Sequence, residues 1–164
     1  MIMNKILLFT PICKPKSVLE ASLPSYLNLE TDGFEYDVLI YNDNNQEDAR
    51  NYTSEFIKEN EKVNLLPDIF SDTSSYTKHS WNIDLIDRIS TIKNAAINYA
   101  LENKYDYIFL VDADLVLNPY TLKSLYQSNK KFIFEIFWTM FTNAKFYKPN
   151  AWDYHSWVYD SANS

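Results

Sequence analysis

The sequence predicts an α/β protein, built as a three-layer α/β/α sandwich around a mostly parallel central sheet. Two observations lead to this prediction. Short apolar runs typical of buried strands alternate along the chain with segments of helical periodicity. The chain has 164 residues, which is enough for one domain with a substantial core. We therefore expect a single domain over residues 1–164, in which the aromatic-rich segment 137–164 is a candidate acceptor side or lid.

The first half of the chain predicts three strands and two helices. Apolar and β-branched runs predict strands over residues 5–10, 36–41 and 62–66. Ser17 and Glu20 form a capping-box pattern that predicts a helix start, and Pro24 is expected to split or kink this helix. A second helix is predicted over residues 47–59, and the polar residues 67–80 are expected to form a loop.

The second half begins with the strongest helical pattern of the chain. Apolar residues at helical spacing predict a long amphipathic helix over residues 83–102. The run at 107–111 is apolar throughout, which predicts a fully buried parallel strand. Asn118 and Pro119 are typical of a helix start and predict a helix up to about residue 128. A further strand is expected at 131–136, and no periodicity follows it.

Composition excludes several classes of function. The net charge of −7 and the pI near 4.8 argue against binding to nucleic acid or to an anionic membrane. No stretch is long enough for a transmembrane segment, no signal peptide is visible, and the single cysteine, Cys13, fits a reducing compartment, so we expect a cytoplasmic protein. Gly33 is the one glycine, which excludes glycine-rich phosphate-binding loops.

Asp112 and Asp114 directly follow the buried strand at 107–111 and form the most informative motif of the chain. In an extended backbone, residues two apart point to the same side, with their α-carbons roughly 6–7 Å apart. Two such carboxylates suit a hard divalent cation that keeps free positions for phosphate oxygens. A short triplet also arises by chance, and Asp often caps a helix. Burial of two acids without a cation is costly, which favours the metal site.

Polar and acidic residues also follow the other predicted strands. They are Thr10 and Pro11, Asn42 and Asp43, and Glu135. The carboxyl ends of parallel strands meet at one edge of a sheet, where ligands bind in open α/β folds. The sequence therefore predicts one constellation at this edge rather than an isolated motif.

Taken together, these pieces resemble the nucleotide-binding part of a glycosyltransferase of the GT-A fold, most like family 2. The matching segments are residues 7–11, 22–27, Asp43, Lys93 with Asn94, and 109–115, with 134–139 similar to a segment of a bacterial subgroup. The resemblance covers about residues 3–138. It implies a Rossmann-like GT-A fold that binds nucleotide-diphosphate sugars, and a metal-dependent transfer of the sugar.

The resemblance also implies roles for single residues on the nucleotide side. Asp43 matches the acid that contacts the nucleobase or ribose, and the backbone near Thr10, Pro11 and Ile12 would line the base pocket. The donor would be UDP- or GDP-linked. Here the second strand ends in Asn42-Asp43-Asn44-Asn45 instead of two acids with a small residue, so the choice of base is open.

On the phosphate side, Asp112 would contact the ribose or the metal, and Asp114 would bind Mn²⁺ or Mg²⁺. Arg88 and Lys93 precede the strand on the long helix and are candidate phosphate contacts, although a solvated helix face explains either cation equally well. Where the family often has arginine, Lys93 lacks the bidentate fork.

The aromatic segment supplies the remaining candidates. Asp153 is the candidate base for the acceptor hydroxyl, and His155 is a candidate metal ligand or base. Packing over the sheet explains the aromatic residues better than sugar stacking does. The acceptor is open among saccharides, lipid-linked glycans and proteins.

Two alternatives compete with the transferase. Only 50 residues follow Asp114, fewer than the family normally has, so the chain is alternatively a truncated or non-catalytic nucleotide-binding half-domain. A phosphatase of the haloacid dehalogenase type also uses an Asp-x-Asp motif. That class places the motif on the first strand, followed by glycine and threonine, which this sequence does not do.

Overall fold

A computed structural model describes residues 3–72, 82–134, 138–139 and 150–151 of the protein. The chain divides into two compact units, Met1–Ser124 and Leu125–Ser164.

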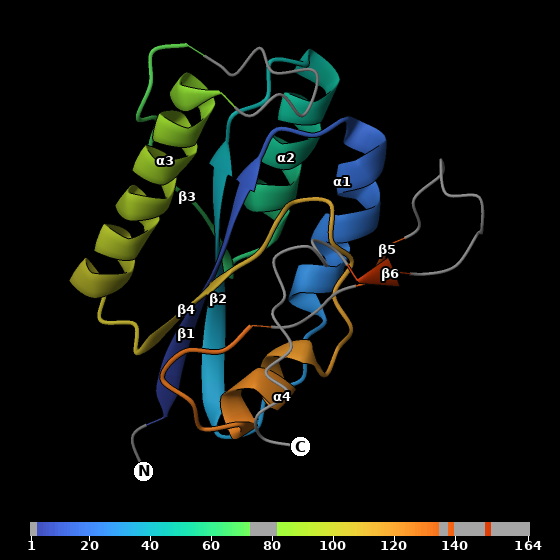
Figure 1. The fold of residues 1–164 in the computed structure, drawn as a ribbon. Coiled ribbons are helices and arrows are strands. Elements are labelled where there is room, and N and C mark those ends of the chain that lie inside the picture. Colours follow the sequence, from blue (N-terminus) through green and yellow to red (C-terminus); the bar gives the residue numbers. More distant parts are fainter. Residues whose placement is uncertain (1–2, 73–81, 135–137, 140–149, 152–164) are drawn as a thin grey trace. The chain divides into compact units, whose positions relative to one another are not determined.

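The first unit contains a parallel four-stranded sheet with the order β3-β2-β1-β4 (Figure 1). The strands are β1 (Asn4–Ile12), β2 (Phe34–Asn42), β3 (Val63–Leu65) and β4 (Tyr107–Leu110). Each lies where the apolar runs predict it. At its carboxyl end, β1 extends two residues beyond its run, to Ile12, and β2 extends one residue beyond its run, to Asn42. The parallel sheet is confirmed.

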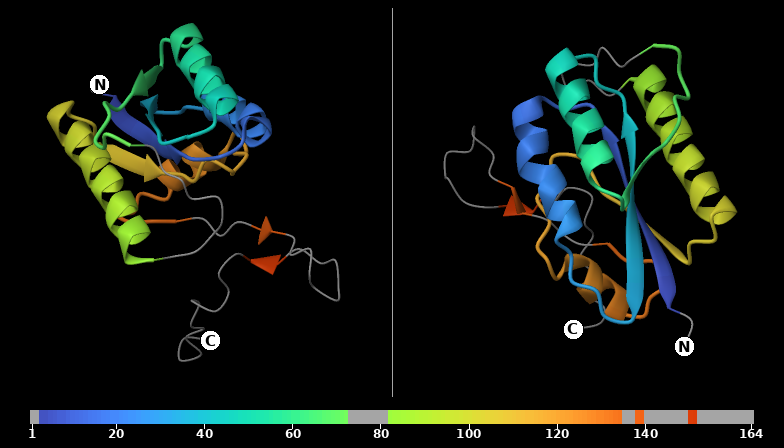
Figure 2. Two further views of the ribbon diagram at one scale, coloured as in Figure 1. Left: turned by 90° about the horizontal axis from the view of Figure 1, so that it is seen from above. Right: turned by 180° about the vertical axis from the view of Figure 1, so that it is seen from behind.

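Helices cover both faces of this sheet. They are α1 (Lys16–Ser22), the 3₁₀ helix η1 (Leu23–Leu27), α2 (Glu47–Glu59) and α3 (Ile83–Glu102). Figure 2 shows α3 on one face and α1 with α2 on the other, which confirms the three-layer arrangement. None of the described helices has both the length and the apolar character that crossing a bilayer requires.

The core follows the two-residue period of the strands. On the α3 face, Leu7 and Phe9 of β1 and Leu39 of β2 pack with Ile92 and Ala96 of α3. The alternate strand residues point to the opposite face. They are also fully or almost fully buried, and include Ile6, Leu8, Val38 and Ile40. Burial on both faces explains why these strands read as continuous apolar runs instead of alternating patterns.

The helix signals were partly correct. Pro24 does split the first helix, because the chain changes from α-helix to 3₁₀ helix at Leu23. The capping box at Ser17 is wrong: Pro15 is the N-cap residue, and no side chain caps the helix. Both α2 and α3 have the predicted bounds, and Asn82 caps α3 by accepting a 2.8 Å hydrogen bond from the Leu85 N–H.

The prediction that the fourth strand is fully buried is wrong. Tyr107 is 41% exposed and Leu110 is 42% exposed. The reason is position: among the described strands, β4 pairs with β1 alone and so lies at the edge of the sheet. An apolar run shows that a strand is compatible with burial, whereas the place of that strand in the sheet decides how much of it is covered.

The remaining elements differ from the sequence predictions. Helix α4 covers Thr121–Gln127, two residues later than its signal, because Asn118 accepts the Tyr120 N–H in a turn that precedes the helix. Residues 131–134 form no strand. Phe132 is exposed, so this apolar segment lacks the burial that would stabilise a strand. In the second unit, Trp138–Thr139 (β5) and Asn150–Ala151 (β6) pair antiparallel.

Candidate functional site

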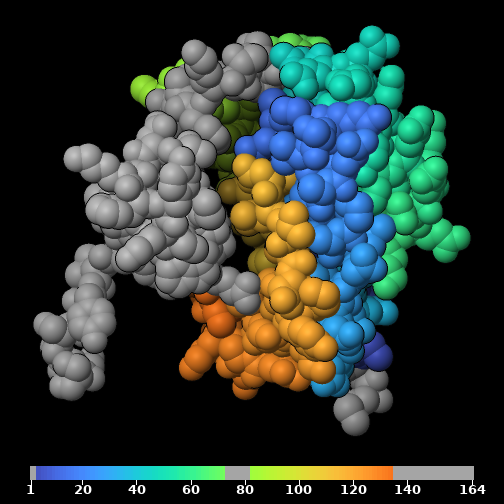
Figure 3. All heavy atoms as spheres, turned by 90° about the vertical axis from the view of Figure 1, so that its right-hand side faces the viewer, coloured from blue at the N-terminus to red at the C-terminus, as the bar shows by residue number. Residues whose placement is uncertain are grey.

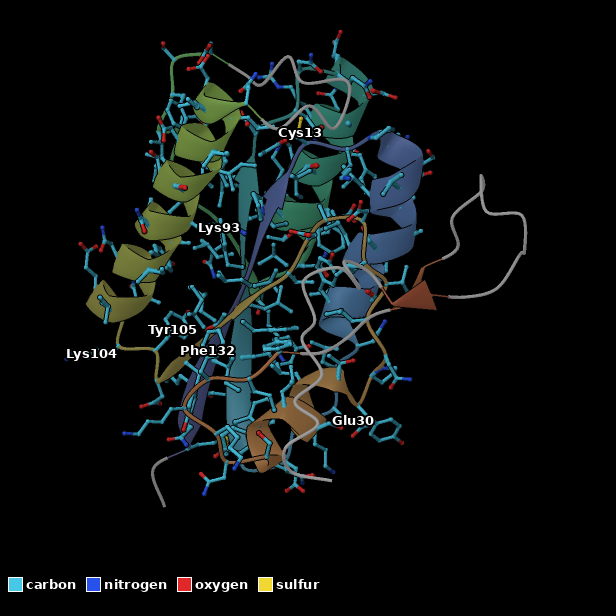
Figure 4. The ribbon with its side chains drawn as sticks, viewed as in Figure 1. Cys13, Glu30, Lys93, Lys104, Tyr105 and Phe132 are labelled. Carbon is cyan, nitrogen blue, oxygen red and sulfur yellow. The ribbon has the colours of Figure 1, made fainter. Side chains whose placement is uncertain are left out.

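The strand order creates a switch point beside β1. Strands β1, β2 and β3 follow one another toward one edge of the sheet, and β4 then returns to the other side of β1. In open α/β sheets the loops after the two strands at such a point diverge, and ligands bind in the crevice between them. Cys13 in Figure 4 marks this carboxyl end of β1, and Tyr105 marks the opposite end of the sheet, before β4.

Asp112 and Asp114 lie at this switch point, but not in the extended backbone that the sequence predicted. Strand β4 ends at Leu110, and the Leu115 N–H donates a 3.1 Å hydrogen bond to the Asp112 carbonyl, so the motif forms a turn. Both aspartates are exposed, whereas Ala113 between them is buried. The cost of burying the two acids therefore gives no support to a metal site.

The backbone of this turn is held from below by α1 and η1. Ser22 Oγ donates a 2.7 Å hydrogen bond to the Ala113 carbonyl, and the Tyr26 hydroxyl donates a 3.0 Å bond to the Asp112 carbonyl. Figure 3 shows the segment after β4 lying against this part of the chain. The Leu117 N–H also donates to Ser25 Oγ at 3.0 Å. The turn is therefore fixed while its two carboxylates face solvent.

Tyr26 allows this clamp to be tested. Burial raises the pKa of the Tyr26 hydroxyl above its ordinary value of 10.0, so folding favours the neutral hydroxyl that donates to Asp112. The stability linked to this group is complete below the unfolded-state pKa and is lost as the pH rises through the folded-state pKa. We expect Tyr26→Phe to lower the free energy of unfolding by about 1 kcal/mol at neutral pH.

The same variant should lose less stability than the wild type when the pH is raised to about 10.5. Urea unfolding at both pH values measures the two effects. Tyr120→Phe is the matched control, because Tyr120 is 59% exposed and should change neither value. Equal pH dependence in wild type and Tyr26→Phe would contradict the assignment.

Lys14 is a site residue that the sequence reasoning missed. Its Nζ donates to Asp114 Oδ2 at 2.5 Å, with side-chain exposures of 26% for Lys14 and 42% for Asp114. The two residues are 100 positions apart, and each follows one of the two strands at the switch point. The available sequence signal was a lysine two residues after the first strand, which is too common a feature to single out.

The donor set at this turn fits a hard cation in its chemistry but not in its number. Two exposed carboxylates are oxygen donors of the kind that Mg²⁺ and Mn²⁺ prefer. One of them, Asp114, binds a positive charge in the structure, the ammonium of Lys14. Across residues 3–72 and 82–134, no group of three or more Asp, Glu, His or Cys side chains is placed to hold a metal. Further ligands would have to come from a substrate or from elsewhere in the chain.

Asp43 and Arg88, both predicted as nucleotide contacts, are joined in an ion pair. Arg88 donates from Nε to Asp43 Oδ2 at 2.9 Å and from Nη2 to Oδ1 at 2.5 Å, and both side chains are about nine-tenths buried. Arg88 also donates to the Asp72 carboxylate and carbonyl and lies 4.2 Å from the Phe70 ring centroid. These contacts, first of all the hydrogen bond to Asp43, raise the pKa of Arg88 further.

A cavity of about 490 Å³ opens next to this ion pair, at the carboxyl ends of β2 and β3. Its lining is mostly polar and includes three acids and one arginine. The residues are Tyr41, Asn42, Asp43, Arg50, Asp68, Phe70, Ser71 and Asp72. Asp43 therefore lines the cavity. Arg88 is not part of the lining, and its ion pair holds the Asp43 side chain in place.

The other predicted nucleotide contacts differ in their exposure. Thr10 and Ile12 are fully buried, Pro11 is partly exposed, and the Thr10 hydroxyl has no hydrogen-bond partner within the described residues. The expectation for these three concerned their backbone, and it stays a prediction. Lys93 is half-buried on α3 (Figure 4).

Three sequence candidates lie outside the described residues. They are Glu135 at the end of the expected fifth strand, the candidate base Asp153 and the candidate ligand His155. Their roles stay predictions.

Comparison with known proteins gives only distant similarity. No family model matches the sequence, and no curated protein matches it. Two solved structures of S. aureus TarS 1-349 are similar in structure. The first shares 14% identity at a TM-score of 0.47, covering 75% of this chain and 31% of the other. The second, in complex with UDP-GlcNAc, shares 19% identity at 0.48, covering 75% and 30%. The chain thus spans less than a third of their length, and these values establish neither a shared family nor a shared activity.

Proposed function

We propose that this protein is a metal-dependent glycosyltransferase of the GT-A type, which transfers a sugar from a nucleotide-diphosphate-sugar donor to an acceptor. The observation that carries the proposal is the Asp112–Asp114 turn, whose backbone is clamped and whose carboxylates face solvent at the switch point of a parallel sheet. This combination suits a site for a charged ligand, because the backbone is held in place while the two carboxylates stay exposed to solvent and accessible.

The sheet geometry also suits a ligand with two ends. Asp43 follows β2 and Asp112 follows β4, and β1 lies between these strands. Two strand spacings separate them by about 10 Å. A nucleoside diphosphate has a neutral base at one end and anionic phosphates at the other. In the proposal the base and ribose lie toward Asp43 and its cavity, and the diphosphate lies toward Asp112 and Asp114.

Each residue then has a definite task. Asp112 and Asp114 would hold Mn²⁺ or Mg²⁺, with His155 as a further ligand, and Lys93 would face the phosphates. A divalent ion bound there supplies charge that stabilises the departing nucleoside diphosphate. Asp153 would accept the proton of the acceptor hydroxyl. Arg88 keeps the Asp43 carboxylate oriented toward the base and ribose.

The test is ligand-dependent stabilisation of the protein. UDP, GDP and UDP-GlcNAc, each with and without Mn²⁺, are added and the unfolding temperature is measured. A ligand that binds only the folded state at a hundred times its Kd stabilises that state by about 2.7 kcal/mol. We expect one nucleotide to give this effect, and only with Mn²⁺. No shift with any combination contradicts the proposal.

A follow-up measurement separates transfer from binding alone. Donor hydrolysis or transfer to an added acceptor, in a sample that binds the nucleotide, supports the transferase. Nucleotide binding with neither reaction, over saccharide, lipid-linked and protein acceptors, supports the non-catalytic alternative instead. The phosphatase alternative is disfavoured because the motif follows β4, an edge strand of the sheet, and not its first strand.

A further inference from the structure

The contact between Lys14 and Asp114 places a cation on the carboxylate to which the proposed function assigns the metal. The Lys14 Nζ and Asp114 Oδ2 are 2.5 Å apart, so the ammonium directly contacts this oxygen. A divalent ion bound to the same oxygen would repel the ammonium at short range. The two cations therefore compete for Asp114.

The strength of the contact suits exchange. Both side chains are partly exposed, and exposed ion pairs contribute only about 0–1 kcal/mol to stability. Lysine carries its charge on a flexible four-carbon stem, so the ammonium can leave Asp114 without moving the backbone. The backbone of the Asp114 turn is meanwhile held by Ser22 and Tyr26, independently of Lys14.

The negative charge of the diphosphate gives the released Lys14 ammonium a new binding partner. The chain has one glycine, so no glycine-rich loop supplies backbone N–H groups to a diphosphate. Arg88 is bound to Asp43 and Asp72. Lys14 stands directly at the switch point, where β1 ends, and its charge is freed when Asp114 acquires another cation.

We infer that Lys14 is an exchangeable counter-ion of the site. Without ligands it neutralises Asp114; when a divalent ion binds Asp114, Lys14 turns to the diphosphate of the donor and neutralises it from the β1 side. This inference rests on the proposed function. It makes Lys14 a residue that binds the sugar donor. It also predicts that metal and nucleotide bind cooperatively, because the metal releases Lys14 for the diphosphate and the diphosphate draws Lys14 away from the metal-binding carboxylate.

The first measurement is the affinity for Mn²⁺ without nucleotide, determined by titration calorimetry on the full chain. Lys14→Met removes the competing charge and should bind Mn²⁺ up to about fivefold more tightly than the wild type, corresponding to the energy of an exposed ion pair. Lys16→Met is the matched control: Lys16 lies two residues further on and pairs with Glu20 at 3.6 Å, away from Asp114. It should bind Mn²⁺ as the wild type does.

The second measurement is the affinity for the stabilising nucleoside diphosphate at saturating Mn²⁺. Lys14→Met should bind it roughly tenfold more weakly, as loss of one charge-assisted contact implies. Lys14→Arg should restore most of this affinity because it keeps the charge. Opposite changes in Mn²⁺ and nucleotide affinity are the signature of exchange, which a purely structural lysine would not produce.

The outcomes separate this inference from the proposed function. If Asp114→Asn abolishes Mn²⁺ binding while wild type and Lys14→Met bind equally, the metal site stands and the role of Lys14 is overturned. Tighter Mn²⁺ binding with unchanged nucleotide affinity overturns it as well, since Lys14 would then never reach the diphosphate. Absence of Mn²⁺ binding in both proteins, with and without the nucleoside diphosphate, overturns the inference together with the metal site.

Discussion

Asp114→Asn is expected to abolish the Mn²⁺-dependent stabilisation by nucleotide while leaving the fold intact. In the proposed site Asp114 is a metal ligand, and the amide of asparagine is neutral and a much weaker donor for a hard cation. At a nucleotide concentration a hundred times the wild-type Kd, the wild type should gain about 2.7 kcal/mol and the variant almost nothing. Thermal unfolding with and without ligands measures the difference.

The control for this experiment is Asp87→Asn on α3, which also removes one exposed carboxylate. It changes the net charge equally, so a general electrostatic effect would affect both variants alike. Without ligands, Asp114→Asn should change the free energy of unfolding by no more than about 1 kcal/mol, because its contact with Lys14 is partly exposed. Wild-type stabilisation retained in Asp114→Asn would remove the motif from the site.

Arg88→Ala is expected to cause the largest loss of stability among the variants considered. Arg88 and Asp43 form a bidentate pair whose side chains are 11% and 9% exposed, so removal of the arginine leaves a buried carboxylate without its main partner. Breaking such a pair on one side costs about 3 kcal/mol. The packing of the guanidinium on Phe70 is lost as well. Urea unfolding measures the change.

Two further variants show that the effect is specific to the pair. Arg50→Ala also removes an arginine beside the same cavity, but Arg50 is exposed, and we expect a change within about 0.5 kcal/mol. Arg88→Met combined with Asp43→Asn removes both charges and should cost less than the two single changes added together. A small loss in Arg88→Ala would mean that Asp43 is sufficiently solvated without it.

The sequence identified the candidate acids but gave them the wrong surroundings. Asp112 and Asp114 were expected in an extended, buried strand end, and they lie in an exposed turn. The prediction that both side chains point to the same side assumes that the strand continues through the motif. In the structure the strand ends before the motif, and hydrogen bonds from Ser22 and Tyr26 hold the motif as a turn. Partners that lie about 90 residues away are not encoded in any local spacing.

Arg88 illustrates a second limit. As a cation on the helix before the motif, it is a candidate phosphate contact, which stays a prediction, and in the structure its guanidinium pairs with Asp43 and Asp72. Residue type determines what a side chain is able to bind, and both a carboxylate and a phosphate suit a guanidinium. Only the tertiary fold, which brings Arg88 of α3 next to Asp43 after β2, selects the carboxylate.

The sequence by itself determined the alternation of strands and helices, the bounds of α2 and α3, and the presence of two acids after the fourth strand. These follow from local periodicity, chain stiffness and capping, which act over a few residues. The tertiary structure decided that β4 is an exposed edge, that Lys14 contacts Asp114 and that Arg88 pairs with Asp43. These depend on strand order, because strand order brings together residues that are far apart along the chain.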